Sequence, residues 1–263
     1  MATEGVRAAS AREIAALLHD APLDEIEALA KRYGDDPRAQ VRKAAAQALR
    51  RYEKQMGERQ RVLDMYQLER ELAGPGIALG VDEVGRGAIA GPLTVCAVAL
   101  PSEPVIWGLN DSKQLTPQKR EALAARIAEV ALAIGIAHIE PASIDAVGMG
   151  SAIRMGMSQA IENAGIEPDA VLIDGNPVHV HPREKTLVKG DARVACIAAA
   201  SIVAKVTRDA MMCAYAEDYP DYHLDACKGY GSAEHIEAVR ALGCSPIHRV
   251  SFCGNFLETP RLF

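Results

Sequence analysis

Aromatic residues are scarce in this chain of 263 residues: they make up 4% of it, with a single Trp. Any core must therefore be filled mainly by Ala, Val, Ile and Leu, and a chain of this length can bury a sizeable one. No apolar run reaches the roughly 18–20 residues that a spanning helix needs, and the N-terminus has no apolar signal core. We therefore expect a cytoplasmic protein with no membrane segment.

The sequence also lacks the cysteine spacing that is typical of zinc sites, and it has no excess of positive charge. None of the six cysteines forms a C-x-x-C pair, which argues against zinc and favours reduced core cysteines. The first 75 residues hold 13 Lys and Arg against 13 Asp and Glu, so the whole net charge of −6 arises after residue 75. Such an acidic region can bind nucleic acid if its carboxylates hold cations and its basic groups line one groove.

Residues 1–73 show helical spacing and dense charge, and a capping box at Ser10–Glu13 opens the first helix. Gly74-Pro75-Gly76 breaks the pattern, so we expect a helical N-terminal extension over 1–73 and a linker at 74–76. The extension is either a stabilising appendage or partner surface, which its balanced charge favours, or a clamp on nucleic acid. The basic residues that would serve a clamp are Arg38, Arg42, Lys43, Arg50 and Arg51.

Strands and helices alternate from residue 77 onward, which favours an α/β layer architecture for 77–263. Expected strands lie at 77–81, 93–100, 131–140 and 170–173, with a short fifth at 186–188. A long helix over 193–219 begins with small residues that let it lie close against a sheet. After about residue 220, Gly and Pro divide the chain into short helical pieces.

Two adjacent carboxylates, Asp82 and Glu83, follow the apolar run 77–81, and Gly85-Arg86-Gly87 comes next. Neighbouring residues on a strand point to opposite faces. The two acids can therefore share a site only where the strand ends, bulges or twists. An ordinary strand exit with solvated acids is the competing interpretation.

The sheet could bring two further acids to the same site. Asp174 ends an apolar strand, and Asp209 lies within the long helix. Each alone has an ordinary explanation, and Asp209 could simply pair with Lys205 four residues earlier. Together the four would repel one another unless a cation neutralised them. Oxygen ligands suit Mg²⁺ or Mn²⁺, and two such ions would support hydrolysis of a phosphodiester.

Six ordered blocks carry a family resemblance over about residues 77–253. They read G-V-D-E-V-G-R-G, D-S-K, L-I-D-G, K-G-D-A-R-V-A-C-I-A-A-A-S-I-V-A-K-V-T-R-D, K-G-Y-G-S and H-R-V-S-F. The chain resembles bacterial ribonuclease HII, of the type 2 ribonuclease H family. The resemblance implies a ribonuclease H-like fold, a mixed five-stranded sheet flanked by helices, with a helical C-terminal part at about 220–263.

The resemblance also implies site residues. By it, Asp82, Glu83, Asp174 and Asp209 are the catalytic, metal-binding acids. Gly85, Arg86 and Gly87 match a loop that reads the 2′-hydroxyl at an RNA–DNA junction, and Tyr230 matches a tyrosine that packs on the neighbouring sugar; a half-buried turn tyrosine is the alternative. Lys113, Lys189, Lys228 and Arg249 fall in family blocks as candidate phosphate contacts, with surface charge as the alternative for each.

The departures from the family pattern are Ala88 in place of a usual Pro and Val250 in place of a usual Arg. His179 and His181 could mimic a metal pair, but no third ligand is evident and Pro182 indicates a loop. Hard-metal carboxylate chemistry needs no histidine.

The expected function is hydrolysis of the RNA strand of RNA–DNA hybrids and cleavage at single ribonucleotides in duplex DNA, with Mn²⁺ or Mg²⁺, leaving 5′-phosphate and 3′-hydroxyl ends. Ribonucleotide and primer removal is the implied role. A non-catalytic hybrid-binding protein and a small-molecule phosphohydrolase are the alternatives. We expect a monomer, with Phe256 and Phe263 as candidate contacts to a replication clamp.

Overall fold

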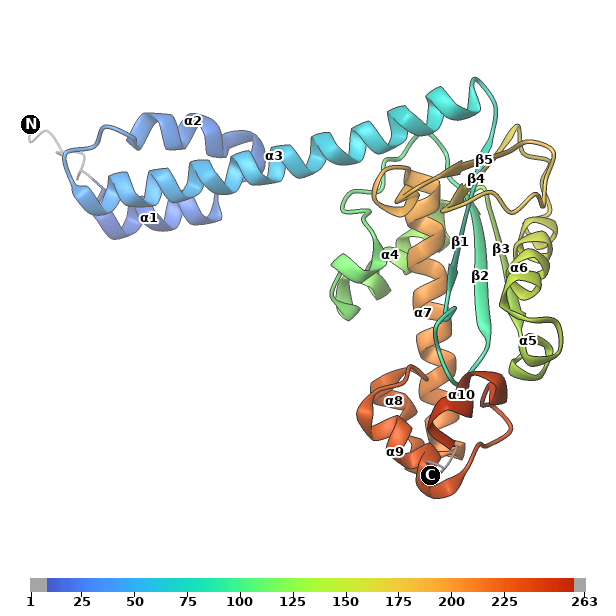
Figure 1. Ribbon diagram of the computed structural model, residues 1–263. Coiled ribbons are helices and arrows are strands. Elements are labelled where there is room, and N and C mark those ends of the chain that lie inside the picture. The colour runs from blue at the N-terminus through green and yellow to red at the C-terminus, as the bar shows by residue number, and fades with distance from the viewer. Residues whose placement is uncertain (1–8, 258–263) are drawn as a thin grey trace, which may run out of the picture. The chain divides into compact units, whose positions relative to one another are not determined.

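The computed structural model describes residues 9–257, and the chain divides into two compact units, Met1–Arg61 and Val62–Phe263 (Figure 1). The first unit holds α1 (Ala11–Asp20), α2 (Leu23–Tyr33) and the beginning of α3 (Ala39–Ala73). The capping box predicted at Ser10 is confirmed, because its hydroxyl accepts from the Glu13 N–H and the Glu13 carboxylate accepts from the Ser10 N–H. Ile14, Leu18, Ile26 and Val41 are buried between the helices.

Several of the basic side chains considered for a nucleic-acid clamp are engaged inside the first unit. Arg38 forms an ion pair with Asp36 at 2.8 Å and donates to the Ala9 carbonyl. Arg51 donates to the Leu18 carbonyl, and Arg42 donates to the carbonyls that precede α3. These contacts stabilise the three-helix unit and so favour the appendage interpretation over the clamp.

A mixed five-stranded sheet is the centre of the second unit, as the family resemblance implies. Its strands are β1 (Ala78–Val84), β2 (Leu93–Ala99), β3 (Ala133–Ile139), β4 (Ala170–Asp174) and β5 (Glu184–Leu187). The order is β3-β2-β1-β4-β5, in which β1 pairs antiparallel with β2 and parallel with β4. The fifth strand begins two residues earlier than predicted, because β5 pairs with β4 from Glu184.

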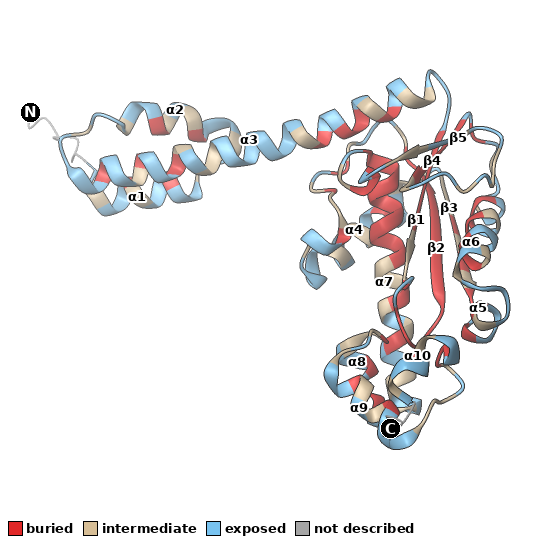
Figure 2. Cartoon of the chain, in the orientation of Figure 1, coloured by how far each residue is buried: buried red, intermediate tan, exposed pale blue. Residues whose placement is uncertain are grey.

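Helices cover both faces of this sheet (Figures 1 and 2). The long helix α7 (Ala195–Asp218) packs on one face, and α5 (Pro141–Val147) and α6 (Met149–Asn163) pack on the other. The helix α4 (Pro117–Val130), with Thr116 as its N-cap, lies beside α7. Between residues 9 and 257, no helix is both long enough and apolar enough to cross a bilayer.

Close contact between β1 and α7 requires a glycine at position 80. A Cβ on Gly80 would overlap the backbone of Cys196 and Ile197, which cannot move without shifting the helix. We expect Gly80→Ala to lower the free energy of unfolding by about 3 kcal/mol through overpacking. Urea unfolding measures this, and Gly150→Ala is the matched control because nothing lies within 4 Å of its added Cβ. Equal stability of the two variants would contradict this packing.

The last turns of α3 pack on the sheet unit and supply a buried acid to the start of α7. Glu69 is 7% exposed, and its carboxylate accepts from the Cys196 N–H at 2.7 Å. The Tyr66 hydroxyl accepts from the Ile106 N–H at 3.1 Å. The predicted extension, 1–73, and the predicted linker, 74–76, meet at the end of α3. The two compact units instead divide within α3, between Arg61 and Val62.

Burial raises the pKa of Glu69 to about 7, against which its hydrogen bonds to Cys196 act. The unfolded chain releases this proton near pH 4.5 while the folded chain keeps it, so stability should fall as pH rises from about 4.5 to about 7. The expected loss is on the order of 3 kcal/mol. Glu69→Gln should flatten this part of the curve, as denaturant unfolding at several pH values would measure. Parallel curves for the two proteins would contradict the prediction.

The C-terminal part is helical, as predicted, and lies at one end of the sheet (Figure 1). It contains α8 (Leu224–Cys227), α9 (Ala233–Leu242) and α10 (Val250–Leu257). Its small core joins residues of these helices to Met212 of α7 and to Ile89 and Ala90, which follow β1. This packing places the C-terminal helices next to the loop that follows the two adjacent acids.

Candidate active site

Two of the predicted acids lie side by side where the parallel pairing of β1 and β4 ends. The register pairs Val81 with Ile173, and Asp82 and Asp174 are the next residues on the two strands. Residues two positions earlier on each strand pack in the core against α7 or lie on its backbone, so both acids leave the sheet on that face. The structure therefore brings Asp82 and Asp174 together.

Glu83 begins on the opposite face of β1 but belongs to the same electrostatic group. Pairing with β2 continues to the end of β1, whereas pairing with β4 stops at Val81, which leaves this edge open. Burial, followed by the charges of Glu83 and Asp174, raises the pKa of Asp82 well above its usual range. Burial raises the pKa of Glu83 too, and Arg86, 3.9 Å away, opposes that rise. Asp82 and Glu83 can therefore interact because the β4 side of β1 is unpaired beyond Val81, although β1 itself continues to Val84.

A fourth acid of this group is Asp191, which is not among the acids predicted from the sequence. It is 8% exposed in a short 3₁₀ helix (Gly190–Ala192), and the preceding Gly190 N–H donates to the Asp174 carboxylate at 2.6 Å. Burial, followed by the charges of Asp174 and Asp111, raises the pKa of Asp191 to about 6. Its position in the K-G-D block, two residues after a candidate lysine, is the signal that could have indicated it.

Asp209 does not join the other acids, so its predicted place in the set is corrected. Its carboxylate accepts from the Lys205 ammonium at 2.8 Å, which is the pairing that the four-residue spacing allowed. Ser201 hydrogen-bonds Asp82, and Asp209 lies eight residues further along the same helix, a rise of about 12 Å. Asp209 therefore belongs to an ion pair on α7 and not to the acidic group at the strand ends.

The D-S-K loop lies over the acids, and two of its side chains face them. The Ser112 hydroxyl is 2.9 Å from the Ser201 hydroxyl, and Ser201 stabilises the ionised form of Asp82. Partial burial works against the charged form of Lys113, yet neighbouring carboxylates raise its pKa; these are Asp111, Asp82, Asp191 and Asp174. Lys113 thus interacts electrostatically with three carboxylates of the acidic group, those of Asp82, Asp174 and Asp191.

The loop Gly85-Arg86-Gly87 follows β1 directly and presents its middle and last residues to solvent. Gly85 has φ +89°, and a Cβ there would overlap the Arg208 guanidinium, so only glycine suits the position. Gly87 is exposed, with nothing within 4 Å of an added Cβ, and the Arg86 side chain is 69% exposed. The loop therefore leaves backbone and one guanidinium accessible to a ligand.

Arg249 holds this loop from inside, so its predicted phosphate contact is wrong. It is 0% exposed, and its guanidinium donates to four carbonyls, those of Gly85, Arg86, Ala88 and Gly91. Burial, with the nearby Arg208 charge, lowers the pKa of Arg249 to about 10, which leaves it charged at neutral pH. A side chain so enclosed serves the loop and cannot reach a nucleic-acid backbone.

A second buried guanidinium, that of Arg208, joins the same loop to the loop that carries Tyr230. It donates to the Pro92 and Ala90 carbonyls at 2.8 and 2.9 Å and to the Lys228 carbonyl at 2.7 Å. Its Cζ lies 5.4 Å from the centre of the Tyr230 ring. The predicted 2′-hydroxyl loop and the predicted sugar-packing tyrosine are therefore parts of one rigid assembly.

The remaining predicted contacts lie at the surface. Tyr230 is half-buried, and the Lys205 ammonium is 5.7 Å from its ring centre. The Lys228 ammonium donates to the Asp225 carbonyl and to Cys213 Sγ at 2.8 Å. Lys189 is exposed and has φ +58° at the start of the short helix of Asp191. Phosphate contacts by Lys189 and Lys228 stay predictions.

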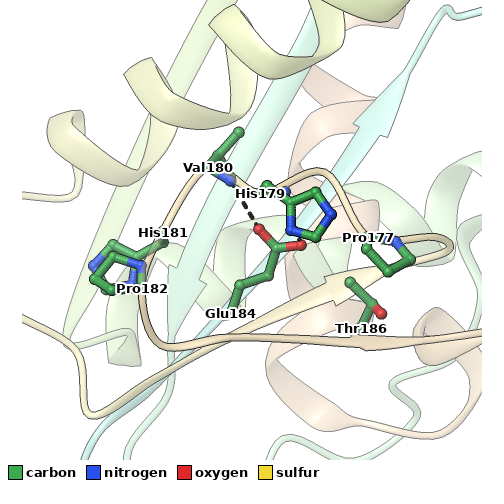
Figure 3. Close-up of a pocket in the computed structure, with 7 residues that line it drawn as sticks. All are labelled: Pro177, His179, Val180, His181, Pro182, Glu184 and Thr186. Carbon is green, nitrogen blue, oxygen red and sulfur yellow. Dashed lines mark hydrogen bonds between the residues drawn. The ribbon is translucent and has the colours of Figure 1, made fainter.

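A separate hollow of about 590 Å³ lies on the loop between β4 and β5 (Figure 3). The Glu184 carboxylate points into this loop and accepts from the N–H groups of Val178, His179 and Val180. His181 Nδ1 accepts from the Arg183 N–H. The histidines and Glu184 thus shape the loop, and no three His, Cys, Asp or Glu side chains within 9–257 form a ready-made metal cluster.

The fold is that of type 2 ribonucleases H. Ribonuclease H2 from Pyrococcus horikoshii matches with a TM-score of 0.59 and 25% identity, over 70% of this chain and all of that one. The ribonuclease HII of a complex with PCNA from Archaeoglobus fulgidus matches with a TM-score of 0.56 and 25% identity, over 66% of this chain and 93% of that one. The predicted ribonuclease H-like fold is confirmed.

Sequence comparisons define the family more closely. The ribonuclease HII family model matches residues 79–255, and the ribonuclease HII N-terminal domain model matches residues 10–73. Ribonuclease HII of Lactobacillus delbrueckii is 43% identical over 82% of this chain and 85% of its own, and that of Geobacillus kaustophilus is 42% identical over 87% and 92%. The chain belongs to the ribonuclease HII family and is an enzyme of the endoribonuclease H class.

Proposed function

We propose that this enzyme cleaves the RNA strand of RNA–DNA hybrids and cuts duplex DNA at single embedded ribonucleotides. The observation that carries the proposal is that one buried arginine, Arg208, ties the loop after Gly85 to the loop of Tyr230 beside the acids. A ribose can thus meet exposed backbone and a tyrosine ring next to the carboxylates. The 2′-hydroxyl is the group that distinguishes RNA from DNA at such a site.

The metal-binding acids are proposed to be Asp82, Glu83, Asp174 and Asp191. Their donors are all oxygens, and burial together with mutual repulsion disfavours their charged forms, a conflict that divalent cations relieve. The donor set fits Mg²⁺ or Mn²⁺. When bound, such ions supply charge neutralisation at the phosphodiester and a more acidic water.

The protein's own groups then orient the substrate. Lys113 faces the acids and is placed to balance charge on the cleaved phosphate, and the Gly85–Gly87 backbone contacts the ribose at the junction. In-line attack of water on phosphorus would leave a 5′-phosphate and a 3′-hydroxyl. Removal of ribonucleotides from DNA, and of RNA primers, is the cellular role that follows from this specificity.

A contact with a replication clamp stays a prediction for this chain. The Archaeoglobus fulgidus relative is described in complex with PCNA. Here Phe256 is partly buried against the C-terminal core, and its carbonyl accepts from Arg240 Nε at 3.3 Å, which limits its use as a clamp anchor. The other candidate, Phe263, lies outside the described residues. A monomer is likewise still a prediction.

The test is a cleavage assay on duplex DNA with one embedded ribonucleotide, with an all-DNA duplex and an RNA–DNA hybrid beside it. Wild type and Asp82→Asn are assayed with Mg²⁺, with Mn²⁺ and with chelator. We expect cutting at the ribonucleotide only, lost with chelator and in the variant. Binding without cleavage in either metal would overturn the proposal and favour a hybrid-binding protein, and hydrolysis of phosphate monoesters instead would indicate a small-molecule phosphohydrolase.

A further inference from the structure

The segment that carries Tyr230 is held by its main chain at three successive carbonyl groups. The Lys228 carbonyl accepts from Arg208, and the Gly229 carbonyl accepts from the N–H groups of Ile89 and Ala90 at 2.9 and 3.1 Å. The Tyr230 carbonyl accepts from the Ser232 N–H at 2.8 Å and lies 2.9 Å from His235 Nδ1. The first two anchors come from the site itself, and the histidine comes from α9 in the C-terminal part.

His235 is one of two buried histidines in contact. His235 and His248 are 0% and 2% exposed, and their Nε2 atoms are 3.1 Å apart. At the far end, His248 Nδ1 lies 3.1 Å from the Ser245 N and 2.8 Å from the Ser245 hydroxyl. A chain of hydrogen bonds thus runs from Ser245 through both rings to the Tyr230 carbonyl.

Only one arrangement of protons satisfies this chain. The Ser245 N–H can only donate, so His248 Nδ1 must accept and the His248 proton must lie on Nε2. The Tyr230 carbonyl can only accept, so His235 Nδ1 must carry a proton and donate. The His248 Nε2–H then donates to His235 Nε2, and both rings are neutral.

The surroundings of the two rings keep them neutral. Burial, followed by the neighbouring His235, lowers the pKa of His248 to about 4, and burial also lowers the pKa of His235. The Tyr222 ring packs 4.7 Å from the His248 ring, and its hydroxyl donates to the Gly243 carbonyl, away from both histidines. The Cys227 sulfur lies 3.5 Å from His235 Nδ1, and the charge of His223 also lowers the pKa of His235.

We propose that His235 and His248 are positioning residues, which act as a directional relay of neutral imidazoles that sets the main chain of Tyr230 and thereby the placement of its ring on the substrate sugar. The inference deepens the proposed function and rests on the role given there to Tyr230. Neither histidine touches substrate in this scheme. The relay joins the start of α10, through Ser245 and His248, to the ribose-recognition assembly.

The relay itself is tested without activity. Nitrogen-15 NMR at neutral pH, with each histidine assigned by its loss in His235→Asn or His248→Asn, reports which ring nitrogen carries the proton. We expect the Nδ1–H tautomer for His235 and the Nε2–H tautomer for His248. The same tautomer at both positions, or a protonated ring, would overturn the relay whatever the enzyme cleaves.

Its effect on cleavage is tested by a double-mutant cycle on the single-ribonucleotide duplex, with His235→Phe, Tyr230→Ala and the double variant. We expect His235→Phe to lower kcat about tenfold, because small misplacement of a positioning group has effects of this order. In the Tyr230→Ala background it should cause little further loss. His235→Asn, whose amide can still donate to the Tyr230 carbonyl, should recover most of kcat.

Tyr222→Phe is the matched control, because it removes a hydrogen bond from the same small core and leaves both histidines in place. Its kcat should equal that of wild type. An equal fall in kcat for His235→Phe with and without Tyr230 would overturn the proposal, because a general loss of structure is additive. Unchanged cleavage by Tyr230→Ala would overturn the role of Tyr230 in the proposed function, while the tautomers still decide the relay.

Discussion

Replacing Asp191 by asparagine is expected to lower the rate of ribonucleotide cleavage by about a thousandfold, whereas Asp209→Asn should lower it far less. Asp191 is buried beside Asp174 and is one of the four acids proposed to hold divalent cations. Loss of one such ligand removes several kcal/mol from the stabilisation of the transition state, and each 1.36 kcal/mol is a factor of about ten. Asp209→Asn breaks a partly exposed ion pair with Lys205, an interaction of about 0–1 kcal/mol.

The two variants are a matched pair, because the substitution is the same and both sites lie in the same unit. Single-turnover cleavage with saturating Mg²⁺ or Mn²⁺ measures the rate, and thermal unfolding checks that both proteins are folded. Partial rescue of Asp191→Asn at higher Mn²⁺ would agree with a ligand role. A larger loss for Asp209→Asn than for Asp191→Asn would restore the assignment that the sequence suggested.

Arg249→Met is expected to destabilise the protein by about 3–5 kcal/mol. The methionine fills part of the space but supplies none of the donors. The carbonyls of Ala88 and Gly91 lose their Arg249 hydrogen bonds, and the Gly85 carbonyl keeps the Ala88 N–H alone. Urea unfolding measures the change. Because the loop after β1 loses its support, cleavage of the single-ribonucleotide duplex should fall even at a temperature where the variant is folded.

Arg240→Met is the control for Arg249→Met, since Arg240 is exposed on α9 and donates to the Phe256 carbonyl. It should change stability by less than about 0.5 kcal/mol. If Arg249→Met were as stable as wild type and instead bound hybrid with a salt dependence weaker by about one phosphate contact, the buried role would be wrong.

Local patterns predicted most of the secondary structure. The capping box at Ser10 and the apolar strand 170–173 each depend on neighbouring residues, and both lie where the pattern indicates. The alternation of strands and helices likewise predicted the α/β layers, whereas the mixed five-stranded sheet followed from the family resemblance. The ordered motifs indicated the ribonuclease HII family, which the comparisons confirm.

Assignment of roles to single charged residues depended on contacts between distant parts of the chain. Asp191 and Asp209 each lie one or two residues after a basic residue within a family block, and nothing in the local pattern distinguishes their roles. The fold separates them, because the short helix of Asp191 returns to the end of β4 while α7 carries Asp209 about 12 Å past the acids. Arg249 looked like a phosphate contact, and only its burial under a loop some 160 residues earlier shows otherwise.

The sequence by itself determined the elements, the α/β class, the family and the presence of an acidic, oxygen-donor site. The tertiary structure alone decided which acids share that site, which arginines are buried supports, and how the loop of Tyr230 is tied to the loop of Gly85. The physical reason is that strand and helix signals arise from short-range periodicity. The pKa and accessibility of a charged side chain depend instead on every group packed around it, wherever that group lies in the chain.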